Sequence, residues 1–269
     1  MRRDGHIHTP YCPHGTKDTL ESYINKAISE NFNTITFTEH APLPKNFVDT
    51  TPDKDSGMDH ALLMDYFKEL QGLKNKYLDR IKIFVGLEID YILGYENETR
   101  DFLNKYGHFL DDAILSVHFL PFDNIYTCID FSPETFLEFC EQVGSIEKVY
   151  NLYYDTVRSS IDADLGPYKP KRIGHPTLIH KFQLAHGEII DDTEQIQQLL
   201  QYMKKAGYEL DVNSAGISKA FCKEPYPPFD MISYAKSIEL PMVFGSDAHS
   251  VKDLHQHYNK IYPITFKTE

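Results

Sequence analysis

Seven short runs of apolar and β-branched residues alternate with stretches of helical periodicity along this chain. Such alternation is typical of repeated strand–helix units, in which parallel strands form a sheet that helices cover. The expected strands cover residues 3–8, 34–38, 82–87, 113–117, 172–174, 208–212 and 241–245. The expected helices cover residues 16–31, 59–77, 95–106, 133–142, 145–160, 192–206 and 228–238. The pattern therefore predicts an α/β fold.

The length of the chain fits a single folded domain. It has 269 residues, of which 41% are hydrophobic, and α/β barrels of this size bury a single core. No repeat or long linker interrupts it, so we expect a single domain over residues 1–269. Residues 119–171 form an insertion after the fourth strand.

Side chains that can bind a metal follow almost every expected strand. Seven of the 13 histidines lie at strand ends or in the loop after one. In a parallel α/β barrel, the carboxyl ends of the strands form the face where chemistry occurs. We therefore expect a functional site at this face. Its candidate residues are His6, His8, His14, His40, Glu88, His118, His175, Asn213, Asp247 and His249.

The pair His6-x-His8 places two imidazoles on one face of a strand, where they can bind one Zn²⁺, Mn²⁺ or Fe ion. Alone, such a pair is more often two packing or exposed polar residues. Glu88 could likewise be a surface carboxylate. Asp4 and Glu39 could orient the imidazoles or cap the local backbone. The other histidines are expected to be ordinary surface or packing residues: His60, His108, His180, His186, His255 and His257.

Composition narrows the classes of partner. The formal net charge of −13 argues against nucleic-acid backbones and anionic membranes as general partners. No apolar run is long enough for a transmembrane helix, and no signal-peptide stretch precedes the first strand. The four cysteines are far apart and form no C-x-x-C pair, which indicates reduced thiols. We therefore expect a cytoplasmic protein whose anionic substrate would need a local positive site.

Six short motifs carry a resemblance to a known family. In order, they are Asp4-x-His6-x-His8, Thr38-Glu39-His40, Gly86-Leu87-Glu88, Ser116-Val117-His118, Gly174-His175-Pro176 and Ser246-Asp247-Ala248-His249. This series resembles the polymerase-and-histidinol-phosphatase (PHP) family of metallo-phosphoesterases over essentially the whole chain. Two further segments resemble its histidinol-phosphatase branch, namely Asn213-Ser214-Ala215-Gly216 and Glu224-Pro225-Tyr226-Pro227.

The resemblance implies a distorted (βα)₇ barrel with three divalent transition-metal ions at the carboxyl-terminal rim of its strands. It implies that Glu88 bridges two of the ions. Mixed histidine and carboxylate ligation suits Zn, Mn or Fe. The implied ligands are His6, His8, Glu88 and Asp247 for one ion, Glu88, His118 and His175 for the second, and His14, His40 and His249 for the third.

Such a site suits phosphoester hydrolysis. Bound cations dominate the local field, so an acidic protein can hold a phosphate dianion, and a metal lowers the pKa of its bound water to roughly 7. Besides Glu88 and Asp247, we expect Arg158 to act here, because the insertion leaves the barrel at this end. Lys181 and Lys219 lie near strand-end loops and are further candidates for contacting phosphate. Each of these cations could instead be a solvated surface charge.

The resemblance also implies a substrate, L-histidinol phosphate, hydrolysed to L-histidinol and inorganic phosphate in histidine biosynthesis. Two alternatives stay open. The chain could be another PHP-type phosphoesterase, such as a 3′-exonuclease or a small-molecule phosphatase, or it could be a non-catalytic metal-binding scaffold. A nuclease favours a basic groove, which the charge pattern does not offer. A scaffold predicts missing ligands, and all nine positions hold competent residues.

Overall fold

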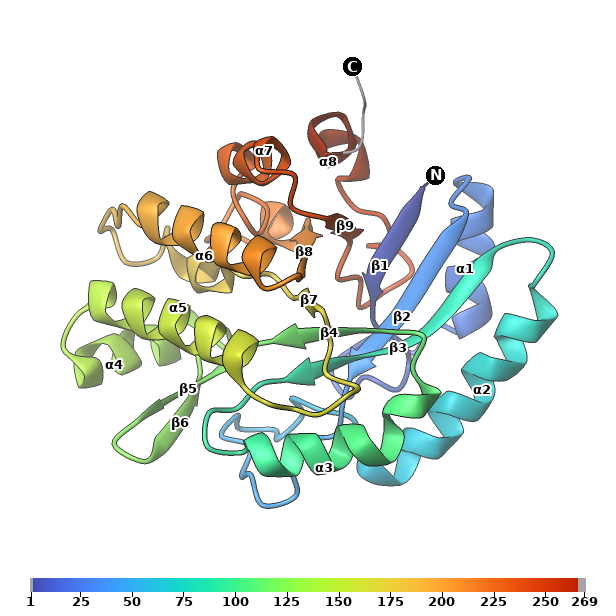
Figure 1. Cartoon of the computed structure of the whole chain (residues 1–269), viewed down its shortest axis with the longest axis horizontal. Helices are drawn as coiled ribbons and strands as arrows, with labels where there is room; N and C mark the ends of the chain where they lie inside the picture. The colour runs from blue at the N-terminus through green and yellow to red at the C-terminus, as the bar shows by residue number, and fades with distance from the viewer. Residues whose placement is uncertain (1, 266–269) are drawn as a thin grey trace.

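The computed structural model describes residues 2–265. Seven parallel strands form a nearly closed barrel in the order β1-β2-β3-β4-β7-β8-β9, with the helices outside it (Figure 1). The strands are β1 (Arg3–Ile7), β2 (Thr34–His40), β3 (Lys82–Asp90), β4 (Asp112–Ser116), β7 (Arg172–Ile173), β8 (Glu209–Asn213) and β9 (Met242–Gly245). The predicted (βα)₇ barrel is therefore confirmed.

Within the described residues, seven helices lie where the periodicity predicts them, the last helix is not predicted, and several begin at a polar cap. Thr19, Ser132 and Ser145 each accept a hydrogen bond from a backbone N–H in the first turn of the helix that follows. Among the described residues, no helix is both long and apolar enough to cross a membrane. The helices are α1 (Leu20–Ser29), α2 (Leu63–Lys76), α3 (Glu96–Tyr106), α4 (Pro133–Val143), α5 (Ile146–Asp162), α6 (Thr193–Lys205), α7 (Phe229–Ser237) and α8 (Tyr258–Thr265).

The first and last strands meet at their carboxyl ends. The backbone N–H of Asp247 donates to the carbonyl of His6 at 2.8 Å, and that of His8 donates to the carbonyl of Ala248 at 3.0 Å. These bonds bring segments about 240 residues apart in the chain into direct contact. They set the His6-x-His8 pair beside Asp247.

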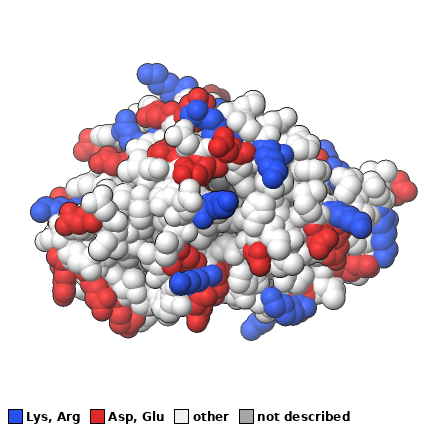
Figure 2. Space-filling view, turned by 90° about the horizontal axis from the view of Figure 1, so that it is seen from below, with Lys and Arg blue, Asp and Glu red and all other residues white. Residues whose placement is uncertain are grey.

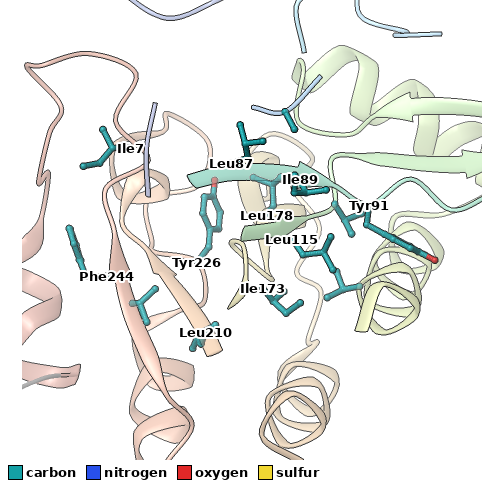
Figure 3. Close-up of a cluster of buried hydrophobic side chains, with 14 of the residues drawn as sticks. Ile7, Leu87, Ile89, Tyr91, Leu115, Ile173, Leu178, Leu210, Tyr226 and Phe244 are labelled. Carbon is teal, nitrogen blue, oxygen red and sulfur yellow. The ribbon is translucent and has the colours of Figure 1, made fainter. Parts of the chain in front are cut away.

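Alternation along the strands separates the apolar core from a polar barrel interior. On β3, Leu87 and Ile89 belong to the apolar cluster of Figure 3, whereas Glu88 between them contacts histidines of other strands. On β8, Leu210 belongs to the same cluster, whereas Asp211 contacts His6. Successive side chains of a strand point to opposite faces. Burial of the apolar residues in the core therefore turns Glu88 and Asp211 into the barrel interior.

The insertion contains an element that the periodicity did not predict. Residues 119–171 begin with a hairpin of β5 (Phe119–Phe122) and β6 (Ile125–Cys128), which lies beside α4 and α5 (Figure 1). Its two turn residues, Asp123 and Asn124, have φ values of 48° and 62°. Positive φ at both positions is typical of a two-residue hairpin turn, and Asn and Asp tolerate it.

Candidate functional site

The carboxyl ends of the strands surround a cavity of about 520 Å³. Glu88 and Asp247 line this cavity. Seven of the ten predicted strand-end and loop residues belong to its wall, whereas His6 and His8 are fully buried behind it. The histidines in the wall are His14, His40, His118, His175 and His249.

A first group of donor atoms converges between β1, β3 and the end of β9. Nε2 of His6 lies 3.3 Å from Oε2 of Glu88 and 3.6 Å from Oδ1 of Asp247. Nε2 of His8 lies 3.4 Å and 3.1 Å from the same two oxygens. The structure thus brings together the four side chains expected for one ion, as two nitrogens facing two carboxylate oxygens.

The opposite edge of each imidazole contacts a buried carboxylate. Nδ1 of His6 lies 2.8 Å from Oδ2 of Asp211, and Nδ1 of His8 lies 3.2 Å from Oε1 of Glu39. A carboxylate that accepts a hydrogen bond from Nδ1–H favours the tautomer with a free lone pair on Nε2, as metal-binding histidines require. Glu39 fits both of its predicted roles, because its carboxylate contacts this imidazole and also accepts hydrogen bonds from the backbone N–H groups of Thr9 and His40 at 2.8 and 2.9 Å.

Glu88 faces a second group of donors with its other oxygen. Oε1 lies 2.9 Å from Nε2 of His175 and 3.8 Å from Nε2 of His118, and it accepts a hydrogen bond from the Ser116 hydroxyl at 2.6 Å. Nδ1 of His118 lies 2.6 Å from Asp90. The two oxygens of Glu88 therefore face different donor groups, which is the geometry that a bridging ligand needs.

The third predicted group assembles differently, because His40 and His249 converge with His8 and Cys12 while His14 approaches His249 from one side. Nε2 of His14 lies 3.2 Å from Nε2 of His249, and the ring of His40 lies 5.2 Å from that of His14. The Cys12 sulfur lies within 4.8 Å of donor nitrogens of His8, His40 and His249. Burial and Glu39 raise the pKa of the Cys12 thiol.

Buried carboxylates favour positive charge at the first two donor groups. Burial lowers the pKa of His8, but Asp247 and Glu39 raise it to about 9 overall. Burial likewise lowers the pKa of His118, and Asp90 and Glu88 raise it to about 10. The carboxylates thus favour positive charge at these two groups, whereas burial and the neighbouring His8 lower the pKa of His40 and His249 in the third.

The donor set fits a divalent transition metal. Imidazole nitrogens and carboxylate oxygens are the ligands of Zn, Mn and Fe sites. Nδ1 of the buried His40 has no hydrogen-bond partner, although buried polar atoms are seldom left unpaired. It lies 3.3 Å from Oε2 of Glu88. A buried imidazole nitrogen without a partner, close to a carboxylate, fits a metal ligand.

The predicted phosphate-binding cations are placed differently from one another. Lys181 lines the cavity and forms an ion pair with Asp130 at 2.8 Å. Lys219 also lines it, is exposed, and has no ion pair within residues 2–265. Arg158 does not reach the cavity. It lies exposed on α5 with its guanidinium 4.7 Å over the ring of Tyr202 in α6, because that face of α5 packs toward α6.

Comparison with known proteins identifies the family. Residues 4–215 match the PHP domain. This chain belongs to the PHP domain family. The PHP chain is 48% identical to histidinol-phosphatase of Bacillus subtilis (strain 168) over 260 residues, which covers 96% of this chain and 97% of that protein.

Two solved structures resemble this PHP domain. HisK of Listeria monocytogenes has a TM-score of 0.92 at 41% identity, covering 96% of this chain and 99% of its own. Histidinol phosphate phosphatase HisK of Lactococcus lactis, solved with zinc, L-histidinol and phosphate, has a TM-score of 0.70 at 20% identity. The latter match covers 99% of this chain and 94% of the other. Both share the fold of the PHP domain described here.

Sequence reasoning missed several polar residues of this PHP site. Asp90 and Asp211 orient His118 and His6, and Asp130 pairs with Lys181. Strand alternation could have revealed Asp90, which lies two residues after Glu88 and hence on the same face. Asn213 contacts a candidate ligand, since its side-chain amide donates to Oδ2 of Asp247 at 3.1 Å.

Proposed function

We propose that this PHP domain is a metal-dependent phosphomonoesterase that hydrolyses L-histidinol phosphate to L-histidinol and inorganic phosphate, a step of histidine biosynthesis. The observation that carries the chemistry is the convergence of two donor groups on the two oxygens of Glu88. Identity of 48% to the Bacillus subtilis enzyme over 96% of the chain supports the substrate. The Lactococcus lactis structure with zinc, L-histidinol and phosphate supports the same ligand class.

Three ions would be held by nine side chains. His6, His8, Glu88 and Asp247 would bind the first, Glu88 with His118 and His175 the second, and His14, His40 and His249 the third. Zn, Mn and Fe all suit this set. When bound, divalent ions supply Lewis-acid charge at the phosphoryl oxygens and acidify water.

The side chains of this chain would orient both the ligands and the substrate. With metal bound, Asp211, Glu39 and Asp90 would hold the imidazoles of His6, His8 and His118 with the proton on Nδ1 and Nε2 free. Lys219 would face a phosphate oxygen as a point charge, and Lys181, held by Asp130, would supply a second cation. A cavity of about 520 Å³ suits a small phosphomonoester.

The proposal extends to partners and compartment. A chain with net charge −13 suits a small-molecule substrate rather than nucleic acid or an anionic membrane. On the face shown in Figure 2, lysines and arginines are scattered among acidic residues and form no continuous track. Free thiols at all four cysteines suit the cytoplasm.

A panel of phosphoesters tests this function. The wild-type protein would be assayed for phosphate release from L-histidinol phosphate, p-nitrophenyl phosphate and a sugar phosphate, and for shortening of a single-stranded oligonucleotide from its 3′ end. We expect kcat/KM to be highest for L-histidinol phosphate. Faster turnover of another monoester, or of the oligonucleotide, would contradict the proposal.

A further inference from the structure

A second buried polar cluster lies outside the metal-ligand groups and centres on His180. This residue belongs to the 3₁₀ helix η3 (Leu178–Phe182) and is 4% exposed. Its Nε2 lies 2.7 Å from Oδ2 of Asp192, and its Nδ1 lies 2.8 Å from Oε1 of Glu224. The Tyr154 hydroxyl donates to that Asp192 oxygen, and the Gln183 amide donates to that Glu224 oxygen at 2.8 Å.

Two carboxylates on one imidazole select its protonated form. A neutral imidazole has a single N–H, so one of the two carboxylates would face a lone pair, whereas an imidazolium donates to both. Burial lowers the pKa of His180, but the bonds to Asp192 and Glu224 raise it to about 9. On the other sides of the ring lie Tyr150, stacked at 5.6 Å, and Tyr154, both from α5.

The cluster joins two segments of the cavity wall. On one side of His180, η3 supplies Leu178 and Lys181 to the wall. On the other, Glu224 lies two residues before Tyr226, which is also in the wall. The backbone of Tyr226 forms two hydrogen bonds of 2.8 and 2.9 Å with Asn213 at the end of β8. His180 therefore connects both segments to each other and, through Asp192, to the start of α6.

We propose that His180 is a positioning residue for the substrate, an inference that rests on the proposed function. Its bond to Glu224 joins residues 178–182 to residues 219–226, and its bond to Asp192 holds the ring in place from the side of α6. Together they set Lys181 relative to Lys219 and Tyr226 across the cavity. His180 contacts neither the cavity nor any of the proposed metal ligands. Its loss should therefore act on substrate binding and leave the metal groups intact.

Steady-state kinetics on His180→Gln test this role. We expect KM for L-histidinol phosphate to rise roughly tenfold, kcat to change less than about threefold, and metal content to stay unchanged. A merely structural residue would lower the active fraction, which reduces kcat and leaves KM as it is. The matched control is His186→Gln, whose ring stacks on Phe136 of α4. We expect wild-type KM for it.

Two further measurements isolate the mechanism. Because His180 acts through Glu224, we expect the double variant His180→Gln/Glu224→Gln to have about the same KM as His180→Gln alone. The ratio of the variant KM to the wild-type KM should be largest near pH 7. It should fall towards one above pH 9, where wild-type His180 loses its second donor. A ratio that stays constant with pH, or a KM that His180→Gln does not change, would overturn the inference.

Failure of the proposed function has a different signature. If the wild-type protein did not hydrolyse L-histidinol phosphate, the substrate would be wrong, while binding of inorganic phosphate would still report on the cavity wall. In that event the dissociation constant for phosphate is measured by titration for the wild type, His180→Gln and His186→Gln. Weaker binding in His180→Gln alone supports the positioning role, and equal binding in all three rejects it.

Discussion

His6 and Asp211 form the innermost contact of the site, with Nδ1 of His6 2.8 Å from Oδ2 of Asp211 and both side chains fully buried. The contact directs Nε2 of His6 towards Glu88 and Asp247. Gly245 leaves room for it, since a Cβ there would lie 2.3 Å from Oδ1 of Asp211. The direction of a candidate ligand is thus set by residues that would not touch the metal.

Asp211→Asn should weaken metal binding without removing a ligand. An amide is a poorer acceptor than a carboxylate and no longer favours the Nδ1–H tautomer of His6. We expect affinity for Zn²⁺ to fall about 10- to 100-fold, measured by competition with a chelator. Asp155→Asn, on the exposed face of α5, is the control and should bind as the wild type does. Equal affinities in both variants would show that the contact does not tune the site.

Glu88→Gln should reduce the number of metal ions that the protein binds. The amide keeps the size of the side chain, but it loses the charge that two donor groups share. We expect the number of ions per chain, measured by elemental analysis, to fall, and kcat to fall at least about 100-fold. Glu138→Gln, an exposed residue of α4, should match the wild type. Full metal content in Glu88→Gln would disprove the bridging role.

Lys219→Ala should impair substrate binding, because Lys219 is the cavity-lining cation that no carboxylate neutralises within the described chain. We expect KM for L-histidinol phosphate to rise about tenfold with metal content unchanged. Arg158→Ala should have wild-type KM, since its guanidinium stacks on Tyr202 away from the cavity. A raised KM in Arg158→Ala with a wild-type KM in Lys219→Ala would show instead that Arg158 binds the substrate.

The His180 cluster should make stability depend on pH. The pKa of His180 is about 9 in the folded chain against 6.5 for an unperturbed histidine, so folding favours its protonated form. Its stabilising contribution, on the order of 3 kcal/mol, is complete below pH 6.5 and disappears as the pH rises through 9. In urea unfolding at pH 6 and pH 9.5, the wild type should lose more stability between the two than His180→Gln. Equal losses would show that His180 is not charged in the fold.

The fold and the gathering of candidate ligands at one face were largely readable from the sequence, because the strands follow from local periodicity, whereas the assignment of ligands to ions came from the resemblance to the PHP family and stays a prediction. Apolar runs such as 82–87 mark the strands, and the residue that ends each run, such as Glu88, marks the reactive face. The hairpin at Asp123 and Asn124 was not predicted, since no glycine marks its turn.

Contacts between segments distant in the chain could not be predicted. The sequence gives no sign that Asp211 contacts His6, or that His255 reaches Asp4 at 2.8 Å. His180 and His255 were expected to be ordinary histidines, yet both are buried against carboxylates. Arg158 was expected at the cavity because its helix lies in the insertion. The direction of a side chain on that helix depends on how α5 packs against α6, which the sequence alone does not reveal.

Titration of metal-free protein tests the central claim most directly. The protein would be stripped with a chelator and titrated with Zn²⁺ or Mn²⁺, and ions bound per chain and phosphate released from L-histidinol phosphate would be measured on the same samples. We expect no turnover without metal, and turnover that rises in step with occupancy up to three ions per chain. Undiminished hydrolysis by metal-free protein, or full occupancy without phosphate release, would contradict the account.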